Sequence, residues 1–362
     1  MAKRFPAYLI LLGFLLGNLI KIPIFRPDIK ISPLDLALVI CYIFAIFKKK
    51  NHISYLIFHN SIQIFIIWLF LTLIIGSLNL GFMAFLSGFA YFFRFCLYIF
   101  SYYPLSILFT KSEKKSLIVS LAVMFPILGM IQYVWFPDLR PFTIYGWDMH
   151  YYRVFGTYLD PGFFGLILIW SLLQLINKPF LWVISYIVLA FTYSRSSFLA
   201  FVLGFSRVSS TILLIILIGT TIILLPRSSS GEGVRLERTG SVVSRFDNWQ
   251  ESLQIFKKYP LIGTGFNLLR YQYQDKKNWD TSHAASGSDS SLIFVLTTSG
   301  LIGLTIYLKL LWHLWKYVRQ DRFLSAFFIA IFVHSIFLNS QFYPPIILLF
   351  SLSLAFKADK TL

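Results

Sequence analysis

The hydrophobic residues of this sequence gather in long apolar runs that are separated by short polar segments. The runs lack the period-two alternation of barrel strands, and in hydrocarbon only helices and closed barrels satisfy their own backbone polar groups. We therefore predict an all-α polytopic membrane protein with about 12 transmembrane helices. Several runs are shorter than the roughly 20 residues that cross a bilayer upright, so some helices are expected to be broken, re-entrant or longer than the run. The expected spans are 7–24, 34–47, 61–78, 83–109, 116–136, 162–177, 180–194, 196–206, 211–226, 291–313, 324–338 and 344–356.

The composition agrees with lipid as the main solvent of the chain. Of the 362 residues, 57% are hydrophobic and 13% are charged, which is too apolar for a soluble domain with a wetted surface. The formal net charge is +17, but a nucleic-acid-binding protein gathers its basic residues on one solvated face. Here they stand in short clusters between apolar runs. We therefore predict membrane lipids as partners, and no nucleic acid.

The basic clusters predict the topology, because Lys and Arg accumulate in short cytoplasmic loops. If the chain has twelve spans, the clusters share one side and both termini are cytoplasmic. Lys21, Arg26 and Lys30 are the exception, since this topology places their loop outside. The clusters that share the cytoplasmic side are Lys3–Arg4, Lys48–Lys50, Lys111–Lys115, Lys178, Arg207, Lys316–Arg322 and Lys357–Lys360.

This topology divides one integrated domain into three stretches. Residues 1–225 carry nine membrane helices, 226–290 form a large external loop, and 291–362 carry three more helices. The segment 179–205 leaves two interpretations open: one long span with Arg195 at its middle, or two short helices that meet at Arg195. The two helices are preferred because a single span would move later basic residues to the outside.

The large loop contains one regular pattern. From Phe246 to Phe256, apolar residues recur at spacings of three and four, which predicts an amphipathic helix. Ser244 is expected to cap its N-terminus, and Pro260 is expected to follow its end. Its apolar face is expected to pack on the membrane helices or on the lipid interface. The preceding segment 227–240 is rich in Ser, Gly and charge, and is predicted to be flexible.

Three local motifs suggest a family. Residues 153–162 read RVFGTYLDPG, residues 193–197 read YSRSS, and the stretch 244–304 begins SRFDNWQESLQIFKKYPLIGTGF and ends SDSSLIFVLTTSGLIGL. Together they resemble the O-antigen ligase and Wzy-type O-antigen polymerase superfamily. In that superfamily an arginine and a tryptophan precede an apolar-Gly-x-Gly turn, and a further span opens with Gly-apolar-apolar-Gly.

The resemblance implies a GT-C-like membrane glycosyltransferase. Such enzymes transfer a glycan from a polyprenyl diphosphate carrier to an acceptor, a glycan or lipid-linked glycan, at the outer face of the cytoplasmic membrane. A leaving diphosphate needs positive charge and directed donors, and arginine supplies both without a metal or another cofactor. The expected reaction is therefore metal-independent, and it is expected to invert the anomeric centre.

Arginines are accordingly the first candidate site residues. Arg195 lies between two apolar runs, where the alternative is a side chain that reaches the lipid headgroups. Arg245 matches the loop arginine of the family, and its alternative is a solvated charge. Arg153 and Arg94 are candidate substrate-binding residues, although Arg94 also fits a buried ion pair. Trp249 is a candidate for stacking on a sugar.

The acceptor hydroxyl also needs a group that accepts its proton. Where many relatives have His-Asn before a span, this chain has Ser288-Asp289, which slightly favours a polymerase over a ligase. Asp289 is a candidate base, with an N-cap as the alternative, and His283 is a second candidate. Asp160 before Pro161 has the pattern of a helix N-cap. A flippase or transporter of lipid-linked sugar is the rival function, because it also needs a cationic cavity.

Overall fold

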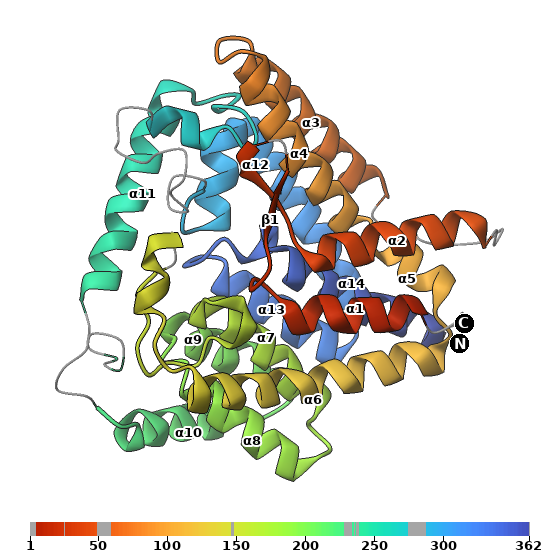
Figure 1. Cartoon of the computed structure of the whole chain (residues 1–362), viewed down its shortest axis with the longest axis vertical. Helices are drawn as coiled ribbons and strands as arrows, with labels where there is room; N and C mark the ends of the chain where they lie inside the picture. Colours follow the sequence, from red (N-terminus) through yellow and green to blue (C-terminus); the bar gives the residue numbers. More distant parts are fainter. Residues whose placement is uncertain are drawn as a thin grey trace.

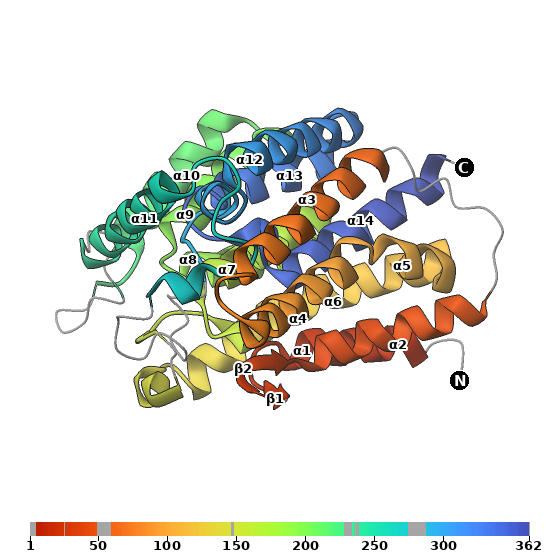
Figure 2. The ribbon, with the colours of Figure 1, turned by 90° about the horizontal axis from the view of Figure 1, so that it is seen from above.

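The computed structural model describes residues 5–24, 26–48, 59–145, 148–227, 234, 236, 239–273 and 287–361. In these ranges the chain is a bundle of fourteen α-helices with one small antiparallel hairpin (Figures 1 and 2). The helices are α1 (Phe5–Leu16), α2 (Pro33–Phe47), α3 (His59–Ser77), α4 (Phe82–Ile99), α5 (Tyr102–Leu108), α6 (Lys111–Trp135), α7 (Pro161–Gln174), α8 (Pro179–Ala190), α9 (Arg195–Phe205), α10 (Thr211–Leu224), α11 (Gly240–Lys258), α12 (Ser291–Val318), α13 (Arg322–His334) and α14 (Pro344–Thr361).

The helical class predicted from the apolar runs is confirmed, and each run overlaps at least one helix of the structure. Among the described residues, four helices are long and apolar enough to cross a membrane, namely α3, α4, α6 and α12. Eight further apolar helices are shorter. The number of spans therefore stays a prediction, and the expected presence of short helices agrees with the structure.

Two of the predicted spans are wrong in extent. The run 83–109 is two helices, because α4 ends at Ile99 and α5 begins at Tyr102. The run 7–24 is helical only as far as Leu16. Gly17 then takes a φ of 52°, a left-handed conformation that glycine adopts without steric cost and that ends the helix.

A β-hairpin follows α1 where the sequence predicted the end of a helix and an external loop. Strand β1 (Ile22–Ile24) pairs with β2 (Arg26–Ile31), and Ile22 lies opposite Ile31. The segment is rich in β-branched isoleucine and contains two prolines, a composition that disfavours a helix interior. The hairpin leads into Ser32, whose side chain caps α2 by accepting a hydrogen bond from the backbone of Asp35.

The helices run between two ends of the bundle. Both termini lie at one end and α11 lies at the other (Figures 1 and 2). Contacts between basic residues and distant carbonyls join several loops at the end that carries the termini. The hydrogen bonds run from Lys48 Nζ to the carbonyl of Leu108 at 2.9 Å, from Arg207 Nη2 to that of Arg319 at 3.2 Å, and from Lys357 Nζ to that of Tyr317 at 3.3 Å. Several of the predicted cytoplasmic clusters are thus brought to one end.

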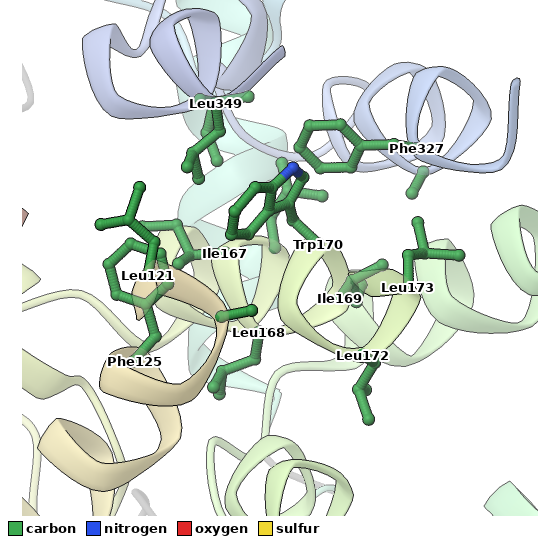
Figure 3. Packing of buried hydrophobic residues seen from close by; sticks show 14 of the residues in the cluster. Leu121, Phe125, Ile167, Leu168, Ile169, Trp170, Leu172, Leu173, Phe327 and Leu349 are labelled. Carbon is green, nitrogen blue, oxygen red and sulfur yellow. The ribbon is translucent and has the colours of Figure 1, made fainter. Parts of the chain in front are cut away.

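Helix α7 is the centre of the bundle. Nearly every residue from Pro161 to Leu173 is buried, so this helix is apolar on all sides and faces other helices instead of lipid. Its Trp170 packs among side chains of α6, α13 and α14 (Figure 3). The indole Nε1 donates a hydrogen bond to Ser353 Oγ at 2.9 Å, which satisfies its only polar group. A helix too short to span lipid alone is stabilised by this complete burial.

The glycines of the third motif join the large loop to α12. Helix α12 is kinked at Gly300, where φ is 69°, and the carbonyl of Leu261 occupies the space that a side chain there would need. The backbone N–H groups of Thr264 and Gly265 donate to the carbonyls of Thr297 and Thr298, both at 3.0 Å. The kink therefore exposes helix carbonyls that the Gly-x-Gly turn satisfies, which holds the segment after α11 on the bundle.

Candidate functional site

Arg195 is the first residue of α9, and α8 and α9 are two separate short helices, as preferred from the sequence. The chain turns sharply between them, because Tyr193 has a φ of 50°. Ser194 caps α9 by accepting from the N–H of Ser197. Arg195 Nη1 donates to the carbonyl of Leu236 at 3.1 Å, so the guanidinium faces the large loop.

Arg153 contacts the backbone of this turn through its guanidinium group. The side chain is only 7% exposed, and its Nε donates to the carbonyl of Thr192 at 2.9 Å. Its Nη2 also approaches the carbonyl of Tyr193 at 3.5 Å. Arg153 therefore supports the turn that carries Arg195, and its role in substrate binding stays a prediction.

Helix α11 brings the second candidate arginine to the same end of the bundle. The amphipathic helix is present, but Ser244 is not its cap: α11 begins at Gly240 after Thr239, and the Ser244 hydroxyl donates to the carbonyl of Gly240. The helix ends at Lys258, just before Pro260, as predicted. Arg245 lies one turn before Asn248 on this helix and is half-buried.

The face of α11 that meets the bundle is more polar than expected. Ser252 and Ile255 are buried, whereas Phe246 is 59% exposed and Leu253 is 40% exposed. Trp249 is half-buried, and its ring centroid lies 6.5 Å from that of Phe337 on the segment after α13. Its buried Nε1 has no hydrogen-bond partner among the described residues. An unpaired buried donor is costly, so Trp249 offers a group that a polar ligand can satisfy.

Asp289 lies just before α12 and is linked to α11. Its backbone N–H donates to Asn248 Oδ1 at 2.9 Å, and the Ser288 hydroxyl donates to the same oxygen at 3.3 Å. The N-cap of α12 is Ser290, so the alternative of Asp289 as an N-cap is wrong. Burial raises the pKa of the Asp289 carboxyl to about 6, Arg245 opposes the shift, and the charges of Asp148 and Asp160 add to it.

The structure brings the three principal candidates together. Arg195 and Arg245 are close enough for their positive charges to repel, and Arg245 attracts Asp289. Asp160 caps α7, as predicted, by accepting from the N–H of Phe163 at 2.9 Å. Burial raises the pKa of Asp160, and Arg153 and Arg245 oppose that shift. The end of the bundle near α11 thus carries a cluster of interacting arginines and carboxylates: Arg153, Arg195, Arg245, Asp148, Asp160 and Asp289.

His334 adjoins this cluster and was not predicted from the sequence. His334 is fully buried at the end of α13. Its Nε2 lies 3.3 Å from both Ser196 Oγ and Ser197 Oγ, and its Nδ1 lies 2.6 Å from Ser340 Oγ. The charge of Arg245 also acts on it. The available signal was an ionisable residue inside the run 324–338, since such residues rarely occur at membrane depth without a function or a partner.

Arg94 belongs to a different charged group. Its Nε forms an ion pair with Asp35 Oδ1 at 2.8 Å, and the Tyr98 hydroxyl donates to the same oxygen at 2.8 Å. Lys21 interacts with both members of the ion pair. The buried-pair alternative thus describes the contacts of Arg94, and its role in substrate binding stays a prediction.

Two predictions concern residues outside the described ranges: His283 as a site residue, and the flexibility of most of the segment 227–240. Among the described residues, no group of three or more His, Cys, Asp or Glu side chains is arranged to hold a metal ion.

The described fold and site define a helical membrane protein with an arginine and carboxylate cluster at one end of its bundle. Residues 180–308 of the chain match the family model of the O-antigen ligase. The matched region contains α9 with Arg195, the whole of α11 and the kinked first half of α12. The resemblance to O-antigen ligases and Wzy-type polymerases is thereby confirmed. No curated protein matches the chain.

Proposed function

We propose that this protein is a surface-polysaccharide polymerase or ligase that transfers a glycan from a polyprenyl diphosphate carrier to an acceptor sugar. The match to the O-antigen ligase supports a glycosyl-transferring enzyme of the bacterial inner membrane that acts on lipid-linked glycans. The end of the bundle with α11 and the loop 226–290 faces outward, and both termini face the cytoplasm. Ser288-Asp289, in place of the His-Asn of many relatives, favours the polymerase.

The observation that carries this proposal is the match of residues 180–308, which include Arg195 and Arg245, to the O-antigen ligase. In the fold, the charges of these two arginines interact. Two like charges held close together repel each other, and the surrounding fold determines both positions. A diphosphate between them converts this repulsion into two attractive, charge-assisted interactions. Guanidinium groups bind phosphate oxygens through parallel N–H donors, and they do so without a metal.

Asp289 is the proposed base. Its carboxyl has a pKa of about 6 because of burial, so it is mostly ionised at neutral pH yet able to accept a proton. The acceptor hydroxyl gives its proton to Asp289, and its oxygen forms a bond to the anomeric carbon. The bond between that carbon and the diphosphate oxygen breaks, and the electron pair leaves with the diphosphate. A single displacement of this kind inverts the anomeric centre.

The test is the lipid-linked glycan that accumulates when the gene is deleted, resolved by chain length. Loss of long chains while single units are still attached to the acceptor indicates a polymerase. Complete polymer that stays on its lipid indicates a ligase. Lipid-linked units that remain in the inner leaflet identify a flippase instead, and unchanged glycans contradict the proposal.

A further inference from the structure

A cavity of about 830 Å³ lies at the end of the bundle that carries the termini, away from the arginine cluster. Four helix ends surround it: the first turns of α6 and α13 and the last turns of α7 and α14. This volume falls within the roughly 300–1,000 Å³ that is typical of ligand pockets. The cavity is therefore large enough for a ligand, and it is independent of the proposed transfer site.

The polar part of the cavity is cationic. Lys111, Lys115 and Lys357 line it, together with the hydroxyl groups of Thr110 and Ser112. Lys111 and Lys115 are exposed at the rim, and Lys357 is half-buried. The ammonium groups of the three lysines are hydrogen-bond donors that bear positive charge, whereas the Thr110 hydroxyl already donates to the Glu113 carboxylate. A ligand with an anionic, oxygen-rich group fits them.

The acidic residue of the lining does not cancel this charge. Asp321 is the N-cap of α13, and its Oδ1 accepts from the N–H groups of Phe323 at 3.0 Å and Leu324 at 2.9 Å. Its carboxylate is thus held at a helix N-terminus, where the helix dipole is positive. The cavity is thus lined by three lysines and by one carboxylate that is bound to a helix N-terminus, which leaves it with excess positive charge.

The remainder of the lining is apolar and lies deeper in the bundle. Ile118, Leu173 and Phe327 are core residues of the cluster around Trp170, and they also line the cavity. Ser353 lies on the lining as well, and it accepts the hydrogen bond of the Trp170 indole. A free phosphate ion gains nothing from such a surface, whereas a hydrocarbon chain does.

We propose that this cavity binds an anionic phospholipid. The lysines hold the headgroup phosphate, and the upper part of one acyl chain enters the apolar portion between α6, α7 and α13. The arrangement follows the general form of basic pockets between membrane helices that bind lipid headgroups. The bound lipid fills the space between four helix ends and ties the termini end of the bundle to the surrounding leaflet.

The test uses the full-length protein in detergent and native mass spectrometry. The probes are phosphatidylglycerol, phosphatidylcholine with the same acyl chains, and inorganic phosphate. We expect phosphatidylglycerol to bind more tightly than phosphatidylcholine. Equal binding of the two lipids would overturn the proposal, because the lysines would then contribute no selectivity.

Two variants separate the headgroup from the chain. In the triple variant K111Q/K115Q/K357Q, affinity for phosphatidylglycerol should fall by about ten- to a hundredfold, since each lysine near a headgroup contributes to binding. The control K178Q/K257Q/K258Q removes the same charge from exposed lysines that do not line the cavity, and it should bind as the wild type does. Unchanged affinity in the first variant, or an equal loss in the control, would refute a specific lysine site.

Val119 also lines the apolar part of the cavity, so Val119→Phe narrows that part while the lysines remain. It should weaken phosphatidylglycerol binding without changing the binding of inorganic phosphate. If phosphate alone binds as tightly as the lipid and Val119→Phe changes neither, the occupant is a free anion and the lipid assignment is wrong. The thermal unfolding midpoint of each variant without added lipid shows that it is folded.

Discussion

Asn248 Oδ1 accepts the backbone N–H of Asp289 at 2.9 Å, although the two residues are 41 positions apart. This bond fixes the middle of α11 against the residues that immediately precede α12. Arg245 is one turn from Asn248 on α11, so the same contact sets the position of the loop arginine relative to the proposed base. A surface helix thereby becomes part of the site.

The first prediction concerns the two arginines. Arg195→Lys and Arg245→Lys keep the positive charge but lose the parallel donors of the guanidinium. Transfer activity should fall by about ten- to a thousandfold for each, as expected when one oriented transition-state donor is lost, while expression stays near normal. The assay is polymer length and lipid-linked intermediate in a deletion strain that carries each variant.

Arg140→Lys is the matched control, because Arg140 is an exposed arginine whose ion pair with Asp138 lies on the surface. It should leave activity unchanged, and Arg94→Lys should be milder than either site variant. Added chelator should have no effect. Full activity of both Arg195→Lys and Arg245→Lys would mean that the diphosphate is bound elsewhere.

The second prediction concerns the pH dependence of Asp289. A base with a pKa of about 6 is protonated and inactive at low pH, so activity should rise with a midpoint near pH 6 and level off above it. Asp289→Asn should lower activity by about a hundred- to ten-thousandfold. The measurement is the initial rate of transfer in membrane vesicles from pH 4.5 to 8.

The stability of Asp289→Asn provides the control. The folded pKa is raised above the ordinary 3.8, so stability falls as the pH rises from about 4 to about 6, and the full penalty on the ionised carboxylate is present above about pH 6. A neutral amide removes this penalty, so the variant should be at least as stable as the wild type at pH 7. A pH profile that keeps its midpoint near 6 in Asp289→Asn would assign the titration to another group.

The third prediction concerns the link from α11. Asn248→Ala removes the acceptor of two hydrogen bonds, from the Asp289 N–H and the Ser288 hydroxyl, which should lower the free energy of unfolding by about 1–3 kcal/mol. Activity should fall more, by about ten- to a hundredfold, because α11 no longer holds Arg245 at a fixed position relative to Asp289. Gln250→Ala on the exposed side of α11 is the control. Equal activity of the two variants would show that the hydrogen bonds of Asn248 are not needed for transfer.

The fourth prediction concerns the kink of α12. Gly300→Ala places a side chain at a φ of 69° and against the carbonyl of Leu261, so it should destabilise the protein by at least about 1–3 kcal/mol. Gly219→Ala in α10 meets no atom within 4 Å and should be neutral or slightly stabilising. Thermal unfolding in detergent compares the two, and similar midpoints would contradict the structural role of the kink.

The fifth prediction concerns topology. In a background with Cys41→Ala and Cys96→Ala, a cysteine placed by Gln250→Cys on α11 should react with an impermeant thiol reagent in intact cells. One placed by Ser112→Cys, at the start of α6, should react only after lysis. The reverse pattern would place the arginine cluster on the cytoplasmic side and remove the basis for transfer at the outer face.

Much of the site could be predicted because it depends on local patterns. The apolar runs located the helices, the Asp160-Pro161 pair located the start of α7, and the turn at Arg195 followed from basic residues in later loops. Ser244 was misplaced as a cap because Thr239 and Ser244 both precede helix-forming residues, and local preference alone does not choose between them. The hairpin was missed because Ile22 and Ile24 end an apolar run that was assigned to a helix, and the charged residues that follow favoured a loop.

By itself, the sequence determined which segments are buried away from water, where most helices begin, and which residue types are present to bind a diphosphate. These properties follow from hydrophobicity and from contacts within one helical turn. Only the tertiary structure decided which charges meet. Arg94 pairs with Asp35, His334 Nε2 lies 3.3 Å from Ser196 Oγ, and the charges of Arg245 and Arg195 interact. The two members of each pair are far apart in sequence. Such contacts depend on how whole helices pack, and no local pattern records them.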